Sequence, residues 1–307
     1  MLGSLILSAS RSPRLRRAVT TVPLTRRVVD RFVAGESLAD VLDTAGTLVA
    51  RGLAVTVDHL GEDTRDARTA GAVRTAYTTL LERLADAGLA HAVEVSVKLS
   101  AVGQALPRDG RAVSLENARL ICAAAAAAGT TVTIDMEDHT TVDATLETVR
   151  ALRTDHPWVG VAVQSMLRRT EADCRDLAVA GSRVRLVKGA YAEPATVAYP
   201  SAAEVDRSFI RCLRVLMAGA GRPMIASHDP RMIEIAGALA RTYRRSPGDH
   251  EYQMLYGIRT DEQLRLAREG HQVRLYLPYG NDWYGYFMRR LAERPANVAF
   301  FLRALAG

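Results

Sequence analysis

The chain has 307 residues, of which 48% are hydrophobic and 24% charged, and its formal net charge is +6. The length is ordinary for one α/β barrel, and the hydrophobic content is enough for a full core. Acidic and basic residues alternate along most of the chain, so we expect no nucleic-acid partner, since nucleic-acid binders concentrate their positive charge. No apolar run reaches the roughly 20 residues that span a bilayer, and the basic excess favours at most peripheral contact with an anionic membrane surface.

Residues 1–50 show helical patterns and no strand, which predicts N-terminal helices packed on a domain at 51–307. From there, short apolar runs rich in β-branched residues alternate with amphipathic or alanine-rich segments. The predicted strands are Leu53–Asp58, Val93–Leu99, Thr131–Met136, Val159–Gln164, Val184–Val187, Pro223–Ser227, Glu251–Leu255 and Gln272–Tyr276. The helices predicted between them are Arg68–Ala87, Leu115–Ala128, Val142–Thr154, Glu171–Ala180, Ala203–Ala220, Arg231–Arg245 and Asp261–Glu269. Eight such repeats predict an α/β fold, a closed (β/α)₈ barrel of the TIM type with extra N-terminal helices.

Polar residues follow seven of the eight predicted strands, at the ends where α/β barrels place their active sites. Buried charges cost several kcal/mol each unless they are paired or used by a ligand. The set therefore predicts a ligand site at the barrel mouth. Its members include Asp58, Glu62, Lys98, Asp135, Gln164, Arg185, Lys188, His228 and Tyr276.

Lysine is almost absent from this sequence: only Lys98 and Lys188 stand among the 40 basic residues. Arginine has evidently been used wherever a generic positive charge suffices. The compact ammonium of lysine, on its flexible stem, fits tight sites in which the larger, planar guanidinium of arginine cannot replace it. Both lysines follow predicted strands, so both are candidate site residues.

The segment after the eighth strand predicts a helix whose start lies at the barrel mouth. Tyr286, Arg289 and Arg290 are spaced i, i+3 and i+4 on it, and Glu293 lies one turn further on. Two adjacent guanidinium groups offer forked donors that suit a carboxylate or a phosphate. Position at the mouth favours a ligand contact over an ordinary exposed basic helix.

With these residues assembled, the sequence resembles the proline dehydrogenases, especially the short monofunctional bacterial form. The resemblance covers nearly the whole chain from the first strand onward, and seven motifs occur in order, each at the matching strand end. They are VSVKLSA at 95–101, TIDMED at 133–138, VQSM at 163–166, VRLVKGAY at 184–191, IASHD at 225–229, YQMLYG at 252–257, and RLYLPYG at 274–280 with YFMRRLAER at 286–294.

The resemblance implies oxidation of L-proline to 1-pyrroline-5-carboxylate by hydride transfer to FAD, with a quinone as electron acceptor. It places Asp135 and Arg185 as catalytic residues and Glu62 as a gate that pairs with the first arginine of the last helix. The implied proline contacts are Lys98, Tyr191, Tyr276, Tyr286, Arg289 and Arg290. The implied cofactor contacts are Met136, Gln164, Arg185, Lys188, Gly189, Ala190, Ser227 and His228. This chain has Asp229 where asparagine is common in the family.

Other interpretations of the same residues remain open at this point. A Schiff-base aldolase on the same barrel would use Lys98 or Lys188 as its nucleophile. A metal-dependent hydrolase would use His59, His139, His228 and Asp135, although we expect no metal, and a binding barrel would have no turnover. The three cysteines are far apart in sequence and fit reduced thiols in a cytoplasmic protein, with peripheral contact at the inner face of the membrane as a further expectation.

Overall fold

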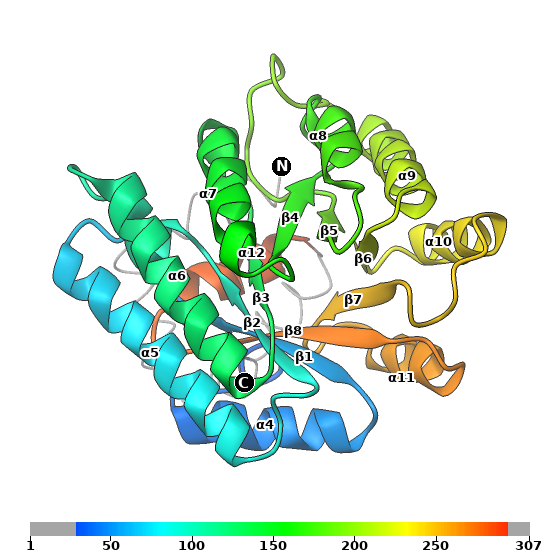
Figure 1. Cartoon of the computed structure of the whole chain (residues 1–307). Helices are drawn as coiled ribbons and strands as arrows, with labels where there is room; N and C mark the ends of the chain where they lie inside the picture. The colour runs from blue at the N-terminus through cyan, green and yellow to red at the C-terminus, as the bar shows by residue number, and fades with distance from the viewer. Residues whose placement is uncertain (1–28, 294–307) are drawn as a thin grey trace, which may run out of the picture.

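The computed structural model describes residues 29–293, with the backbone alone for 289–293. Eight parallel strands close into a barrel in sequential order, β1 to β8, with β8 paired to β1 (Figure 1). The predicted (β/α)₈ fold is therefore confirmed. The strands are β1 (Ala54–His59), β2 (Val93–Val97), β3 (Val132–Ile134), β4 (Gly160–Gln164), β5 (Arg183–Val187), β6 (Arg222–Ala226), β7 (Glu251–Leu255) and β8 (Val273–Tyr279).

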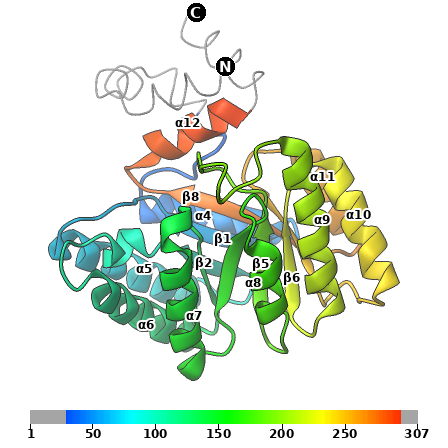
Figure 2. The ribbon, with the colours of Figure 1, turned by 90° about the horizontal axis from the view of Figure 1, so that it is seen from above.

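Helices flank the strands on the outside, and α12 lies across one end of the barrel, apart from that ring (Figure 2). The helix α4 (Leu38–Ala50) precedes β1, and residues 1–28 of the predicted N-terminal helical region lie outside the described chain, so that region stays a prediction. The other helices are α5 (Ala67–Asp86), α6 (Gly110–Ala128), α7 (Val142–Asp155), α8 (Thr170–Leu177), α9 (Ala202–Ala218), α10 (Pro230–Thr242), α11 (Thr260–Arg268) and α12 (Trp283–Glu293). No helix of the described region is long and apolar enough to span a bilayer.

Alternation along each strand explains why the barrel has an apolar outside and a partly polar inside. Successive side chains point to opposite faces of a sheet. In β2, Val93, Val95 and Val97 are fully buried in the core cluster beneath the helices, whereas Glu94 and Ser96 belong to the other face. Inward positions on successive strands thus stack into layers, and polar side chains in the upper layers reach the mouth.

The predicted strand ends differ from the observed ones by up to three residues, and the three largest differences, at the ends of β2, β3 and β8, lie at the barrel mouth. The third strand ends at Ile134 rather than Met136, because the chain turns into a polar loop and a short 3₁₀ helix at His139–Thr141. The eighth strand continues to Tyr279, where it pairs with β1 along six residues. The short helix at Ser100–Gln104 has no apolar period and was not predicted.

The segment 29–36 packs against α12 and the end of β8. The Ala34 N–H donates to the carbonyl of Pro278 at 2.9 Å, and the Gly280 N–H donates to the carbonyl of Gly35 at 3.0 Å. The indole Nε1 of Trp283 donates to Glu36 at 3.1 Å. Val29, Phe32 and Val33 form a second apolar cluster with Leu60 and with five residues of α12: Trp283, Tyr284, Tyr286, Phe287 and Met288. A Cβ on Gly257 would meet the carbonyl of Arg31 at 1.8 Å, so only glycine permits this approach.

Candidate active site

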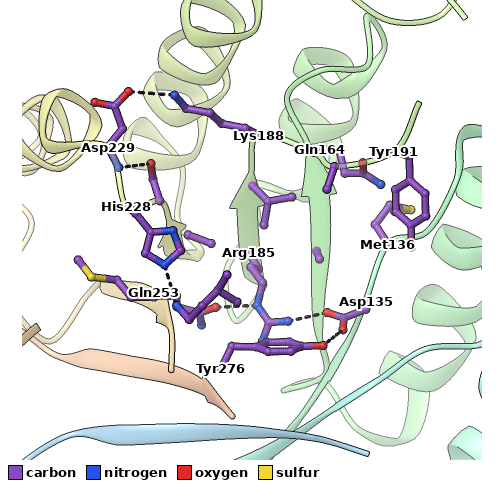
Figure 3. A pocket seen from close by; sticks show the side chains of 18 residues that line it. Asp135, Met136, Gln164, Arg185, Lys188, Tyr191, His228, Asp229, Gln253 and Tyr276 are labelled. Carbon is purple, nitrogen blue, oxygen red and sulfur yellow. Dashed lines mark hydrogen bonds and ion pairs between the residues drawn. The ribbon is translucent and has the colours of Figure 1, made fainter. Parts of the chain in front are cut away.

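A cavity of about 530 Å³ opens at the carboxyl ends of the strands from β3 to β8. Figure 3 shows Arg185, Asp135 and Tyr276 together, with His228 and Asp229 on one side and Gln164, Met136 and Tyr191 on the other. A volume of this size is typical of a small-molecule site. The lining residues include Asp135, Met136, Gln164, Arg185, Lys188, Gly189, Ala190, Tyr191, Ser227, His228, Gln253 and Tyr276.

Asp135 is the centre of a hydrogen-bonded cluster on one wall. It accepts from Arg185 Nη1 at 2.6 Å, from Ser96 Oγ at 2.8 Å and from the Tyr276 hydroxyl at 2.7 Å. The guanidinium carbon of Arg185 lies 5.5 Å from the centroid of the Tyr276 ring, a cation–π distance. Three accepted bonds leave the carboxylate few lone pairs for another proton. The geometry favours an electrostatic partner for Arg185 over a general base.

Lys98 lies next to this cluster and pairs with Asp58, at the end of β1. Its Nζ is 2.6 Å from Asp58 Oδ2 and 3.5 Å from the Tyr276 hydroxyl. Burial lowers the pKa of Lys98, but the negative charges of Asp58 and Asp135 outweigh burial and raise it. Tyr77 holds Asp58 from behind, with its hydroxyl 3.4 Å from Oδ1. The lysine is therefore held as a cation beside the Tyr276 hydroxyl, although it is not one of the residues that line the cavity.

On the β4 side, Gln164 presents an amide whose orientation is fixed. Its Nε2 donates to the carbonyl of Glu137 at 2.5 Å, while its buried Oε1 has no hydrogen-bond partner within the described chain. Gly189, at φ 109°, passes close by: a Cβ there would lie 2.0 Å from Met166 Sδ. Only glycine fits this position. Because it has no side chain, space for a ligand remains next to the unpaired Oε1 of Gln164.

On the β6 side, Lys188 lies between two carboxylates. Its Nζ is 2.5 Å from Asp206 Oδ1 and 3.0 Å from Asp229 Oδ2, so one of its three N–H donors remains for a ligand. Asp229 also caps α10, and hydrogen bonding from Arg231 lowers its pKa. His228 Nε2 accepts the Leu255 N–H at 2.8 Å, which places the proton of the neutral ring on Nδ1.

Some predicted site residues do not line the cavity. Glu62 lies exposed in the loop after β1, and Tyr286 lies buried in the apolar cluster of α12, where Tyr276 packs against it. Arg289 and Arg290 belong to α12, but their side chains lie outside the described residues. Their role as carboxylate ligands stays a prediction.

Three residues of the site were not predicted: Ser96, Asp206 and Gln253. Asp58 was predicted at the barrel mouth, and the structure adds its ion pair with Lys98. Asp58 and Ser96 are paired across β1 and β2, and Gln253 lines the cavity from β7. Strand alternation could have found Ser96 and Gln253, because each lies two residues before another inward position. Asp206 lies on α9, far in sequence from any strand end, and no local sequence pattern marks it as a site residue.

The alternative chemistries fit this geometry less well. A Schiff-base lysine must lose its proton, whereas the raised pKa of Lys98 and the ion pair with Asp58 keep that proton in place. His139 is bonded to Glu193, and His228 accepts from Leu255. Within residues 29–293, no group of three His, Cys, Asp or Glu side chains is arranged to hold a metal ion. The three cysteines are buried free thiols.

Comparison with known proteins agrees with the sequence motifs. The family model described as proline dehydrogenase matches residues 41–303. The chain is 40% identical to proline dehydrogenase of Deinococcus radiodurans over 91% of this chain and 90% of that protein, and 37% identical to proline dehydrogenase 2 of Bacillus subtilis over 92% and 91%. It is similar in structure to proline utilization A of Bdellovibrio bacteriovorus inactivated by N-propargylglycine, with a TM-score of 0.79 and 25% identity over 87% of this chain and 32% of that one. This chain belongs to the proline dehydrogenase family.

Proposed function

We propose that the protein oxidises L-proline to 1-pyrroline-5-carboxylate with FAD as cofactor and a quinone as electron acceptor, the first step of proline catabolism. The observation that carries the proposal is the Asp135–Arg185–Tyr276 cluster, which borders the cavity and has the cation Lys98 at its edge. The cations Arg185 and Lys98, next to a cavity large enough for a flat cofactor, suit the binding of a small zwitterion against that cofactor.

The residues present fit a flavin. Isoalloxazine carries both N–H and carbonyl groups along one edge, and the cavity offers a buried acceptor, Gln164 Oε1, which has no hydrogen-bond partner in the described chain. The remaining N–H of Lys188 and the Gly189 backbone suit phosphate oxygens. Met136, Ala190, Ser227 and His228 would complete the cofactor contacts, since they line the same cavity.

Proline would bind through its carboxylate, and its ring would lie against aromatic side chains. We assign the carboxylate to Lys98, Arg289 and Arg290, and the walls to Tyr191, Tyr276 and Tyr286, with Glu62 as the gate. Three cations would fix a small rigid zwitterion in one orientation, which lowers the entropic part of the barrier. Tyr276 is well placed for this, because its hydroxyl is bonded to Asp135 and lies 3.5 Å from Lys98.

Bound FAD would supply the acceptor for the hydride that leaves the ring carbon next to the proline nitrogen. The chain's contribution would be electrostatic: Arg185 would hold a fixed positive charge beside the bound flavin and so stabilise its reduced, anionic form, and Asp135 would fix the direction of the guanidinium. A preorganised charge of this kind needs no rearrangement during the reaction. Because quinones dissolve in membranes, we also propose peripheral contact with the membrane surface.

The test is an absorbance spectrum of the purified protein, followed by anaerobic addition of proline. We expect a flavin spectrum that bleaches with proline and returns with a soluble quinone. A colourless protein, or a flavin spectrum that proline leaves unchanged, would refute the proposal. A Schiff-base aldolase would instead be trapped by borohydride in the presence of its substrate.

Two variants separate the proposed roles. Arg290→Met should raise the KM for proline about 10- to 150-fold while flavin stays bound, since a hydrogen bond to a charged group contributes about 1.5–3 kcal/mol. Arg185→Met should slow flavin reduction or weaken flavin binding. The matched control is Arg175→Met, which removes a surface ion pair with Glu171 on α8 and should change neither value.

A further inference from the structure

Two carboxylates lie buried inside the barrel, on the side away from the cavity. Glu94 is the second residue of β2 and Glu251 the first of β7, and their exposed fractions are 1% and 0%. Arg183 Nη2 lies 2.5 Å from Glu94 Oε2, and Arg274 Nε lies 2.9 Å from Glu251 Oε1. Burial raises the pKa of Glu251, but the charge of Arg274 outweighs burial and lowers it. Both acids are therefore anions inside the barrel.

Gln253 connects this buried layer to the cavity. Its Nε2 donates to Glu251 Oε1 at 2.5 Å, and its Oε1 accepts from Arg185 Nε at 2.6 Å. A carboxylate can only accept and a guanidinium can only donate, so the amide cannot flip without losing both bonds. The ion pair between Glu251 and Arg274 thus sets the direction in which Gln253 offers its oxygen.

The guanidinium of Arg185 is held by partners in two directions. Nε binds Gln253, and Nη1 binds Asp135 and Ser96. Nη2 makes no hydrogen bond within the described residues and lies 3.8 Å from Glu94 Oε1. Because the group is planar, bonds at Nε and Nη1 fix the position of all three nitrogens. The Gln253 bond is the one that comes from the β7 side.

We propose that Gln253 is a positioning residue, which holds the guanidinium of Arg185 in the orientation that the reaction requires and is itself oriented by the buried Glu251–Arg274 pair. This inference rests on the proposed role of Arg185 beside the flavin. Gln253 acts through Arg185 and need not touch proline. A contribution of this kind affects the rate of flavin reduction and the flavin reduction potential more than the affinity for proline.

The test uses Gln253→Met in the flavin-loaded enzyme. It removes both amide bonds and keeps a side chain of similar length. We expect kcat to fall about 10- to 100-fold, since a lost hydrogen bond to a charged group contributes about 1.5–3 kcal/mol, and the KM for proline to stay within about twofold. The flavin reduction potential should fall, because a less firmly placed cation stabilises the reduced anion less.

The matched control is Gln263→Met. Gln263 is another buried glutamine, 1% exposed, whose Nε2 donates to the backbone at Ile258 and Leu255. This variant loses the same chemical group and should keep the wild-type reduction potential. Equal shifts of potential in the two variants would mean a general effect of packing and would overturn the proposal. If Gln253→Met does not fold, Gln253→Asn, which is too short to reach both partners, should show the same changes.

A double-mutant cycle with Arg185→Lys decides whether Gln253 acts through Arg185. Lysine cannot keep the forked bonds, so Gln253→Met should cost less than about threefold in kcat in that background. An undiminished effect of Gln253→Met there would overturn the proposal and assign Gln253 a direct ligand contact. Failure of the proposed function itself is distinguishable, because the wild-type protein would then show no proline-dependent bleaching at all.

Discussion

Lys98→Met tests whether the lysine and Asp58 act as one unit beside Tyr276, which lines the cavity. The substitution keeps the unbranched stem and removes the ammonium that lies 2.6 Å from Asp58 Oδ2. Asp58, whose side chain is 1% exposed, then becomes a buried carboxylate without its cation. We expect two separate losses, one in stability and one in affinity for proline.

The magnitudes follow from the burial of the pair. Removing one partner of a buried ion pair costs about 3–5 kcal/mol, so the free energy of unfolding should fall by that amount. The loss of one charged hydrogen bond to the substrate carboxylate, about 1.5–3 kcal/mol, should raise the KM for proline roughly 10- to 150-fold. The nearby unpaired Asp58 carboxylate repels the same substrate group, so the upper end of this range is expected.

The double variant Lys98→Met with Asp58→Asn provides the decisive comparison. It removes the orphaned charge, so it should recover most of the lost stability, whereas the KM should recover only in part. Lys98 has a pKa raised above its usual value, so the pair contributes fully at neutral pH and its contribution is lost only as the pH rises through the raised value. The assays are therefore thermal unfolding and steady-state kinetics at about pH 7.5, where both members of the pair are charged. Single and double variants of equal stability would refute the reasoning.

Three further variants probe other parts of the site. Tyr276→Phe removes the 2.7 Å bond to Asp135 and keeps the ring over Arg185, so kcat/KM should fall about tenfold; an unchanged value would show that the hydroxyl is dispensable. Gly189→Ala places a Cβ 2.0 Å from Met166 Sδ at φ 109°, so the purified protein should retain less flavin per chain, and full flavin content would contradict the close approach. Trp283→Phe removes the bond to Glu36 and should lower the free energy of unfolding by about 1 kcal/mol in denaturant titration; no change would mean that this bond does not stabilise α12.

Local patterns were sufficient to predict the barrel. Strand alternation, helix periodicity and the polar strand ends depend on neighbouring residues, and all eight strands were found where β-branched runs predicted them. Each cation of the site could be predicted for the same reason, because Lys98, Arg185 and Lys188 follow or occupy strands. Closure of the barrel then brings the strand ends that carry these three cations to the same end of the molecule.

Asp135, the partner of Arg185, was among the predicted residues, but the carboxylates that pair with Lys98 and Lys188 could not be assigned from the sequence, because these pairings depend on register and on packing between distant elements. Asp58 reaches Lys98 through the pairing of β1 with β2, and Asp206 reaches Lys188 from a helix. The docking of residues 29–36 on α12 joins distant parts of the chain: Trp283 and Glu36, which share a hydrogen bond, are 247 residues apart in sequence. No local pattern encodes such a contact.

The most direct test of the account is a crystal structure of the flavin-loaded enzyme with an unreactive cyclic carboxylate analogue of proline. We predict that the analogue's carboxylate lies within hydrogen-bond distance of Lys98 Nζ and of the guanidinium groups of Arg289 and Arg290, with the flavin ring beside Arg185 and Gln164. An analogue bound elsewhere, or an arginine pair turned away from Lys98, would contradict the claim that these residues form one site.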